Sequence, residues 1–247
     1  MMVSPMVLKV IQDYMNSQYP NEGCGFIVNN IFIPVDNISP NPTKEFLVKD
    51  SDYLKYAEVC SLFVHSHPDW YNCPTKVDME QQQASKIPWG IISTNGEKAS
   101  GIQLLGSQVP TPDLMNRTFC HGITDCCTLI NDWYKLNKGF SWEEVPRDWE
   151  WWLGEDDLYQ SNFARLGFKI IPMEEVMTKG PEIGDVFMAR IRSTKLNHGG
   201  VYIGNGLGLH HLTSQMPVDA TRVPREEPLM RWIKYIHLWA RREVSDA

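Results

Sequence analysis

The chain has little positive charge for its length and contains no long apolar stretch. Of its 247 residues, 23 are Lys or Arg and 30 are Asp or Glu, which leaves a net charge of −7. Domains that hold nucleic acid through its phosphates normally show the opposite balance, so we expect no nucleic-acid partner. No apolar run approaches the roughly 18 residues needed to cross a bilayer. We therefore expect no membrane span, no secretory signal and a protein made and kept in a cytoplasm.

A regular disulfide framework is also missing. The six cysteines do not follow the spacing of a small disulfide-stapled fold, so we expect free thiols. The neighbours Cys126 and Cys127 are poorly suited to a structural disulfide, because that bond needs a particular separation and direction of the two Cβ atoms. A hydrophobic content of 43%, with 17 Gly and 16 Pro, is typical of globular domains.

The first hundred residues combine helical and strand patterns. Ser4 followed by Pro5 predicts a helix start, and the apolar stripe that follows predicts a helix ending before Pro20. Further helices are expected over residues 52–60 and 75–86. Strands are expected at 24–28, 31–35, 62–67, 91–94 and 102–105. These elements predict an α/β domain over residues 1–106.

A second domain is expected after a proline-containing segment with little apolar periodicity, residues 107–117, which we interpret as a linker. The domain at 118–247 begins with a helix from Asp125 or Cys126 to Lys138. Strands are expected at 185–191, 199–203 and 209–213, with a turn at Asn205-Gly206 between the last two. The fold class is therefore α/β (α+β) with two domains.

The first domain carries a candidate metal site. His65 and His67 end a strand pattern at positions i and i+2, so their imidazoles point to the same face. Thr75 and Asp78 are three apart at the start of the next helix and share one side of it. Two His and one carboxylate would leave the fourth tetrahedral position of Zn²⁺ open, as catalytic zinc requires. Glu22 is the candidate acid/base.

Glu22 followed by His65-x-His67-x7-Thr75-x-x-Asp78 resembles the motif of JAMM (MPN-type) metallopeptidases. The resemblance implies one zinc ion per chain held by His65, His67 and Asp78, with Glu22 as general acid/base. Thr75 stands where the family has a serine that stabilises the tetrahedral intermediate, and its β-branch could alter the aim of the hydroxyl. Two other interpretations stay open: ordinary strand histidines with a solvated helix carboxylate, or a metal site without turnover.

The second domain carries a candidate thiol site. Cys126 lies at the expected start of a helix, where the dipole favours thiolate. His198 and His210 lie on the two strands of the expected hairpin. They share a face if the loop has an odd number of residues. Cys127 would point about 100° away from Cys126 around the helix, so only one thiol should face His198.

This half resembles NlpC-type cysteine peptidases, which have a papain-like core and cut the stem peptides of bacterial cell walls. The resemblance rests on Asp125-Cys126, on Gly184-Asp185-Val186, and on the run from His198 to Asn205-Gly206 followed by His210. It implies Cys126 as nucleophile, His198 as base and His210 as the orienting third residue. Cys127-Thr128 replaces the usual Ser-Gly.

Three plainer interpretations remain for the second domain. Cys126 could be a buried small apolar residue, and His210 and His211 could be ordinary strand residues. A group of Cys120, His121, Cys126 and Cys127 could bind metal, although it has no C-x-x-C spacing.

A JAMM-like domain followed by an NlpC-like domain resembles the tail assembly proteins of lambda-like bacteriophages. The resemblance implies other tail-tip proteins as partners, peptidoglycan stem peptides as substrate, and a location in the host cytoplasm during assembly and at the virion tail tip afterwards. A protein of another class fits the same sequence: a structural docking protein of the tail tip whose peptidase-like sites are partly or wholly idle.

Overall fold

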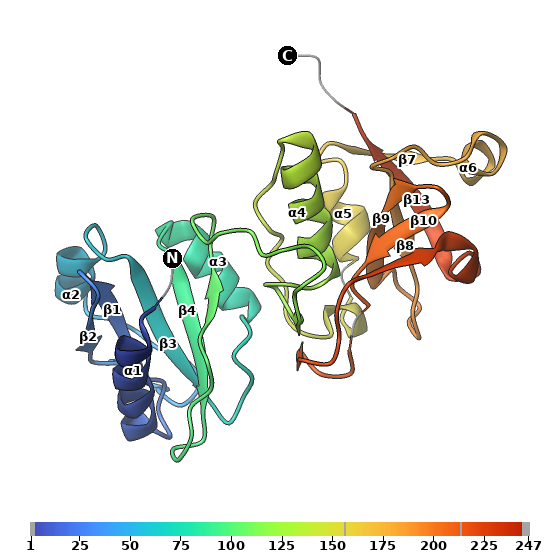
Figure 1. Cartoon of the computed structure of the whole chain (residues 1–247). Coiled ribbons are helices and arrows are strands. Elements are labelled where there is room, and N and C mark those ends of the chain that lie inside the picture. The colour runs from blue at the N-terminus through green and yellow to red at the C-terminus, as the bar shows by residue number, and fades with distance from the viewer. Residues whose placement is uncertain (1–2, 156, 213, 244–247) are drawn as a thin grey trace. The chain divides into compact units, whose positions relative to one another are not determined.

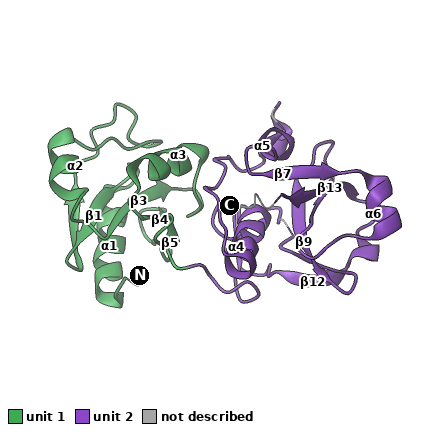
Figure 2. Cartoon of the chain, turned by 90° about the horizontal axis from the view of Figure 1, so that it is seen from above, with its two compact units in different colours: residues 1–110 green, residues 111–247 purple. Residues whose placement is uncertain are grey.

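The computed structural model describes residues 3–155, 157–212 and 214–243. The chain divides into two compact units, residues 1–110 and 111–247, shown in two colours in Figure 2. Both combine helices with a sheet, which confirms the predicted mixed α and β class (Figure 1). The assignment of the two units as a metallopeptidase domain and a thiol peptidase domain remains a prediction.

The first unit is built on a five-stranded sheet with the strand order β2-β1-β3-β4-β5. Strands β3 and β4 run parallel and are connected through α3, and the other neighbouring strands pair antiparallel. The helices are α1 (Pro5–Gln18), α2 (Asp50–Tyr56) and α3 (Lys76–Ser85). The strands are β1 (Cys24–Val28), β2 (Ile31–Val35), β3 (Leu62–Pro68), β4 (Trp89–Thr94) and β5 (Gln103–Leu105).

Strand β3 is buried on both of its faces. Its even-numbered residues Leu62 and Val64 belong to the core formed with the apolar stripe of α1. The side chains of Phe63 and His65 point to the opposite face, because side chains alternate along a strand. There the His65 ring packs against Trp89, with ring centroids 5.5 Å apart. The opposite face of β3 therefore carries both histidines of the predicted metal site into a buried, aromatic environment.

The second unit is built on a six-stranded sheet with the order β12-β10-β9-β8-β13-β7, in which every neighbouring pair is antiparallel. Its strands are β7 (Phe168–Ile171), β8 (Val186–Ala189), β9 (His198–Gly204), β10 (Leu207–His210), β12 (Arg225–Pro228) and β13 (Ile236–Arg242). A separate ladder joins β6 (Phe119–Cys120) and β11 (Val218–Asp219). The α-helices are α4 (Cys126–Lys138), α5 (Leu158–Asn162) and α6 (Met173–Lys179), with 3-10 turns at η1 (Trp151–Leu153) and η2 (Leu229–Arg231).

Helix α4 packs closely against β9. Leu129 and Trp133 join Val201 of β9 in the core of the unit. A Cβ added at Gly199 would lie 3.1 Å from Cδ1 of Ile130, so the absence of a side chain there permits the close approach of helix and strand. This packing brings the N-terminal end of α4 beside the strand that begins with His198.

Several boundaries differ from the sequence expectation. The helix expected over 52–60 runs from Asp50 to Tyr56. The strand expected at 209–213 is Leu207–His210, and Thr213 lies outside the described residues. The elements α5, α6, β12 and β13 were not anticipated, because they are short or lack a clear apolar period. None of the helices in the described ranges could cross a membrane.

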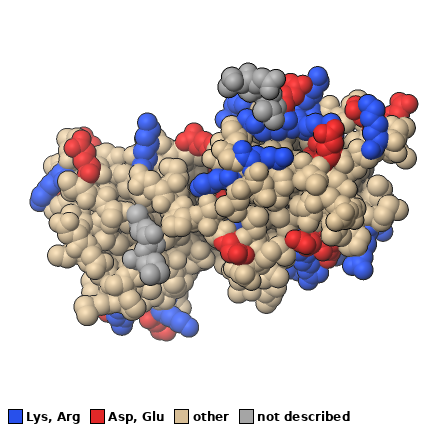
Figure 3. Space-filling model, turned by 45° about the horizontal axis from the view of Figure 1, so that its top comes forward, with Lys and Arg blue, Asp and Glu red and all other residues tan. Residues whose placement is uncertain are grey.

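Charged side chains of both signs lie on the surface of the protein (Figure 3). Acidic and basic side chains are interspersed on the face drawn in Figure 3, and much of that face carries neither. Near the C-terminus, where basic residues are frequent in the sequence, Arg241 forms ion pairs with Asp185 and Glu182.

Candidate metal site and candidate thiol site

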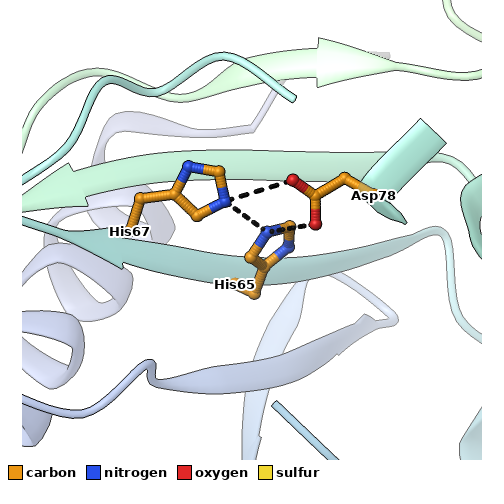
Figure 4. A group of neighbouring side chains, drawn as sticks. All are labelled: His65, His67 and Asp78. Carbon is orange, nitrogen blue, oxygen red and sulfur yellow. Dashed lines mark hydrogen bonds and ion pairs between the residues drawn. The ribbon is translucent and has the colours of Figure 1, made fainter. Parts of the chain in front are cut away.

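The predicted metal ligands lie together in the first unit (Figure 4). The Nε2 atoms of His65 and His67 are 3.0 Å apart. Nε2 of His65 lies 3.2 Å from Oδ1 of Asp78, and Nε2 of His67 lies 3.3 Å from Oδ2. In the part of the chain that the structure describes, this is the only group of three or more His, Cys, Asp or Glu residues that could hold a metal ion.

The capping of α3 places Asp78. Thr75 is the N-cap residue, and its hydroxyl accepts a hydrogen bond from the Asp78 backbone N–H at 3.1 Å. In return, Oδ2 of Asp78 accepts from the Thr75 backbone N–H and hydroxyl, both at 2.8 Å. This reciprocal capping box turns the Asp78 side chain back toward β3. Asp78 is 7% exposed, so it is not a solvated helix carboxylate.

The donor set fits a tetrahedral cation. With Zn–N distances of about 2.0–2.1 Å, two ligand atoms of a tetrahedral site lie about 3.3 Å apart, close to the separations found here. Nδ1 of His67 contacts the Tyr71 carbonyl oxygen at 2.9 Å, so Nδ1 carries the proton and Nε2 presents a lone pair. Burial lowers the pKa of His65 and favours its neutral form, which is the form that binds metal.

Glu22 lies beside these ligands, two residues before β1. Cys24 pairs with His65, and hydrogen bonds between Gly23 and Ser66 continue the ladder, so Glu22 is level with His67. Glu22 is 8% exposed. Its pKa is raised to about 7, mainly because burial disfavours the charge, while a protonated His67 would oppose the shift. A carboxyl of this kind can exchange a proton near neutral pH.

The predicted thiol residues also come together, in the second unit. Asp125 is the N-cap of α4, and its carboxylate accepts from the backbone N–H groups of Cys127 and Thr128. Cys126 therefore occupies the first turn of the helix. Nε2 of His198 lies 3.0 Å from Nδ1 of His210. Cys126, His198 and His210 are all buried.

The electrostatic environment favours the thiolate of Cys126. Its pKa is lowered well below the usual range, first by a hydrogen bond with Cys127 and then by the interaction with His198, against the opposing effect of burial. The pKa of Cys127 is raised, mainly through the same hydrogen bond with Cys126 and through burial. The directions of these shifts favour ionisation of Cys126, the thiol that interacts with His198.

The sulfurs of Cys126 and Cys127 contact the same hydroxyl group. The Tyr159 hydroxyl contacts both of them, at 3.4 Å from Sγ of Cys126 and 3.0 Å from Sγ of Cys127. The pKa of Tyr159 is raised, mainly by burial, so the phenol keeps its proton. Tyr159 comes from α5, a short helix that the sequence pattern does not predict.

A buried ion pair fixes the cap of α4. Nη2 of Arg147 donates to both carboxylate oxygens of Asp125, at 2.9 and 2.8 Å, and Arg147 is 2% exposed. Burial would raise the pKa of Asp125, but Arg147 and His121 outweigh it and hold the pKa well below its usual value. The sequence gives no signal for this pairing, because Arg147 lies in an irregular segment 22 residues after Asp125.

A β-bulge in the hairpin of β9 and β10 brings His198 and His210 to the same face of the sheet. The two-residue turn Asn205-Gly206 alone would place the two histidines on opposite faces. The register shifts by one residue between Leu207 and Gly208, after which His210 pairs with Gly200. His198 and His210 then share a face as diagonal neighbours.

Comparisons with known proteins address the second unit directly. Residues 113–234 match the NlpC/P60 family, which confirms the predicted similarity to NlpC-type proteins. The curated relatives are two phage proteins, each called tail tip assembly protein K. The one from Escherichia phage N15 is 27% identical over 92% of this chain and 93% of its own length. The one from Escherichia phage lambda is 29% identical over 72% of this chain and 80% of its own length.

Two solved structures resemble part of the chain. A Desulfitobacterium hafniense protein matches 42% of this chain and 88% of its own, at 17% identity and a TM-score of 0.33. A Salinibacter ruber protein matches 43% of this chain and 81% of its own, at 21% identity and a TM-score of 0.32. The JAMM assignment of the first unit stays a prediction.

Proposed function

We propose that this chain is a tail assembly protein of a lambda-like bacteriophage with two peptidase sites. The second unit would be a thiol endopeptidase that cuts peptidoglycan stem peptides, and the first a zinc-dependent JAMM-type peptidase. The proposal is supported by the similarity to tail tip assembly protein K over most of the chain and by the NlpC/P60 match. The observation that carries it is the hydrogen-bonded pair of His198 and His210, on two strands that contact the helix beginning with Cys126.

The thiol site has the groups for acyl transfer. The Cys126 thiolate attacks the carbonyl carbon of the substrate amide and forms a C–S bond, while protonated His198 gives its proton to the leaving amine as the C–N bond breaks. Water then attacks the acyl-enzyme with His198 as base, which releases the acid and restores the thiol. The Tyr159 hydroxyl is a neutral hydrogen-bond donor beside the reacting sulfur.

In the first unit, His65, His67 and Asp78 would hold Zn²⁺. The ion would supply a Lewis acid that polarises a carbonyl oxygen and acidifies water. Glu22 would accept and return the proton, consistent with its raised pKa. Thr75 would keep Asp78 oriented through its two hydrogen bonds to Oδ2.

The relatives also suggest a setting. Partners would be other tail-tip proteins, and the protein would be in the host cytoplasm during assembly and at the virion tail tip afterwards. There, stem-peptide cleavage would open the cell wall locally during infection, and the zinc site would process a tail component.

The thiol activity is tested by incubating the protein with purified muropeptides. We expect stem-peptide cleavage by the wild type, none by Cys126→Ala, and unchanged cleavage by the matched control Cys60→Ser, because Cys60 lies in the first unit. Wild-type protein that cleaves no muropeptide would favour a structural docking role for the second unit.

The zinc site is tested by metal analysis and by incubation with candidate tail proteins. We expect about one zinc per chain, lost in His65→Ala and retained in the control His237→Ala, whose side chain is exposed. Glu22→Gln should keep the zinc and lose cleavage of the tail protein. Zinc that stays bound in His65→Ala would reject the ligand set.

A further inference from the structure

The histidine pair of the second unit continues to a carboxylate. Nε2 of His210 lies 3.6 Å from Oε2 of Glu227, which is on the neighbouring strand β12. Nε1 of Trp232 donates to the same oxygen at 2.8 Å. The Trp232 ring also packs on His210, with ring centroids 4.6 Å apart. Glu227 is therefore held in place on the far side of His210 from His198.

The carboxylate decides which nitrogen of His210 carries the proton. Within the described residues Nε2 of His210 makes no hydrogen bond, and the charged group it faces is Glu227. The pKa of Glu227 is lowered, chiefly by its Trp232 and His210 contacts against a burial effect, so the group is charged. A lone pair facing that charge would be repelled. Nε2 of His210 therefore carries the proton, and Nδ1 is a hydrogen-bond acceptor.

The same reasoning then fixes His198. Nδ1 of His210 can only accept, so Nε2 of His198 must donate across the 3.0 Å contact. A neutral His198 then has a lone pair on Nδ1. Among the described residues this Nδ1 atom makes no hydrogen bond, and His198 is the histidine that interacts with the Cys126 thiol. The free lone pair is thus available to take the thiol proton.

We propose that Glu227, oriented by Trp232, is a positioning residue that sets the tautomers of His210 and His198 and so leaves Nδ1 of His198 as the base for Cys126. The inference rests on the proposed thiol peptidase function and extends it by a residue that does not touch the substrate.

Burial lowers the pKa of His210 to about 3, and the charge of His198 adds to this effect while Glu227 opposes it. His210 therefore stays neutral near neutral pH. The other charged and titratable groups around these residues come from several elements. Around His210 they are Glu227 and Arg225, and around Cys126 they are Asp125, Cys127, Arg147, Tyr159, His121 and His211.

The test is the pH dependence of Cys126 alkylation by iodoacetamide, with the labelled residue read by tandem mass spectrometry. Glu227→Leu removes the acceptor that faces Nε2 of His210, so both tautomers of His210 become accessible. Nδ1 of His198 is then no longer kept free as the base for the Cys126 thiol. We expect the rate at pH 6 to fall by about tenfold or more, and the profile to move toward that of an ordinary thiol. The control Glu226→Gln, an exposed neighbour on the same strand, should match the wild type.

A double-mutant cycle separates tautomer control from packing. In Glu227→Gln the indole N–H of Trp232 can only donate, so the amide oxygen takes the position that faces His210. We therefore expect the alkylation rate at pH 6 to fall by about threefold or less. Trp232→Phe alone should also be mild, because a carboxylate accepts in either orientation. In the double variant the amide can turn its NH₂ toward His210, and we expect a loss of about tenfold or more at pH 6.

Either of two results would overturn the inference: an unchanged alkylation profile in Glu227→Leu, or losses in the cycle that simply add. Alkylation needs no peptide substrate. A wild-type protein that shows the lowered alkylation profile but cleaves no muropeptide would therefore reject the proposed function and leave the tautomer inference standing.

Discussion

The buried ion pair between Arg147 and Asp125 leads to the sharpest stability prediction. Replacing Arg147 by Met leaves the Asp125 carboxylate buried without its cationic partner. It also removes the donation from Nη1 of Arg147 to the Val145 carbonyl oxygen at 2.8 Å. We therefore expect Arg147→Met to destabilise the second unit strongly and to loosen the first turn of α4, which carries Cys126.

The size of the destabilisation depends on which interactions of Asp125 are kept and which are lost. Removing one member of a buried ion pair typically lowers the free energy of unfolding by about 3–5 kcal/mol. Asp125 would keep its hydrogen bonds from the backbone N–H groups of Gly122, Cys127 and Thr128. The loss should therefore lie at the lower end, about 3 kcal/mol, which corresponds to a fall in Tm of roughly 10 °C for a unit of this size.

Tryptophan fluorescence during thermal and urea unfolding is a suitable assay, because seven of the nine Trp residues lie in the second unit. Arg147→Lys should fall between the wild type and Arg147→Met, because Lys keeps the charge without the planar fork. Adding Asp125→Asn to Arg147→Met should recover stability, since Asn caps a helix without a charge. A loss below about 1 kcal/mol in Arg147→Met, or no recovery in the double variant, would refute the reasoning.

Three further predictions concern other parts of the chain. Gly200→Ala should lower the unfolding free energy in urea by about 2 kcal/mol or more, because its Cβ would lie 2.5 Å from the Leu209 carbonyl oxygen, whereas Gly101→Ala, which meets nothing within 4 Å, should be nearly neutral. The second unit should lose stability as the pH falls from about 6.5 toward 3, because His210 takes up a proton earlier in the unfolded chain than in the folded one; urea midpoints at several pH values should show a smaller loss in His210→Gln. Thr75→Ser should keep zinc affinity, whereas Thr75→Val should weaken it by about tenfold or more in a chelator competition, because the hydroxyl that orients Asp78 is lost.

Local sequence rules predicted much of the candidate metal site. The spacing of His65 and His67 is sufficient to place both imidazoles on one face of a strand, since side chains alternate with a period of two. Thr75 at a helix N-cap with a carboxylate three residues later is a capping signal that depends on a single turn of backbone. These relationships act over a few residues, so they are readable without the tertiary structure. The positions of Cys126 and Asp125 at the start of α4 belong to the same class.

Contacts between distant segments could not be predicted from the sequence and are seen only in the tertiary structure. The sequence left the face of His210 open, because it depends on a bulge between Leu207 and Gly208 that no turn signal encodes. Arg147 and Glu227 lie in segments without a clear period, and their roles arise only when other elements pack against them. The sequence by itself determined which chemical groups are present and from which face of its own strand or helix each side chain projects. Only the tertiary structure decided which groups meet, because strand register and long-range packing depend on the whole unit and not on any local pattern.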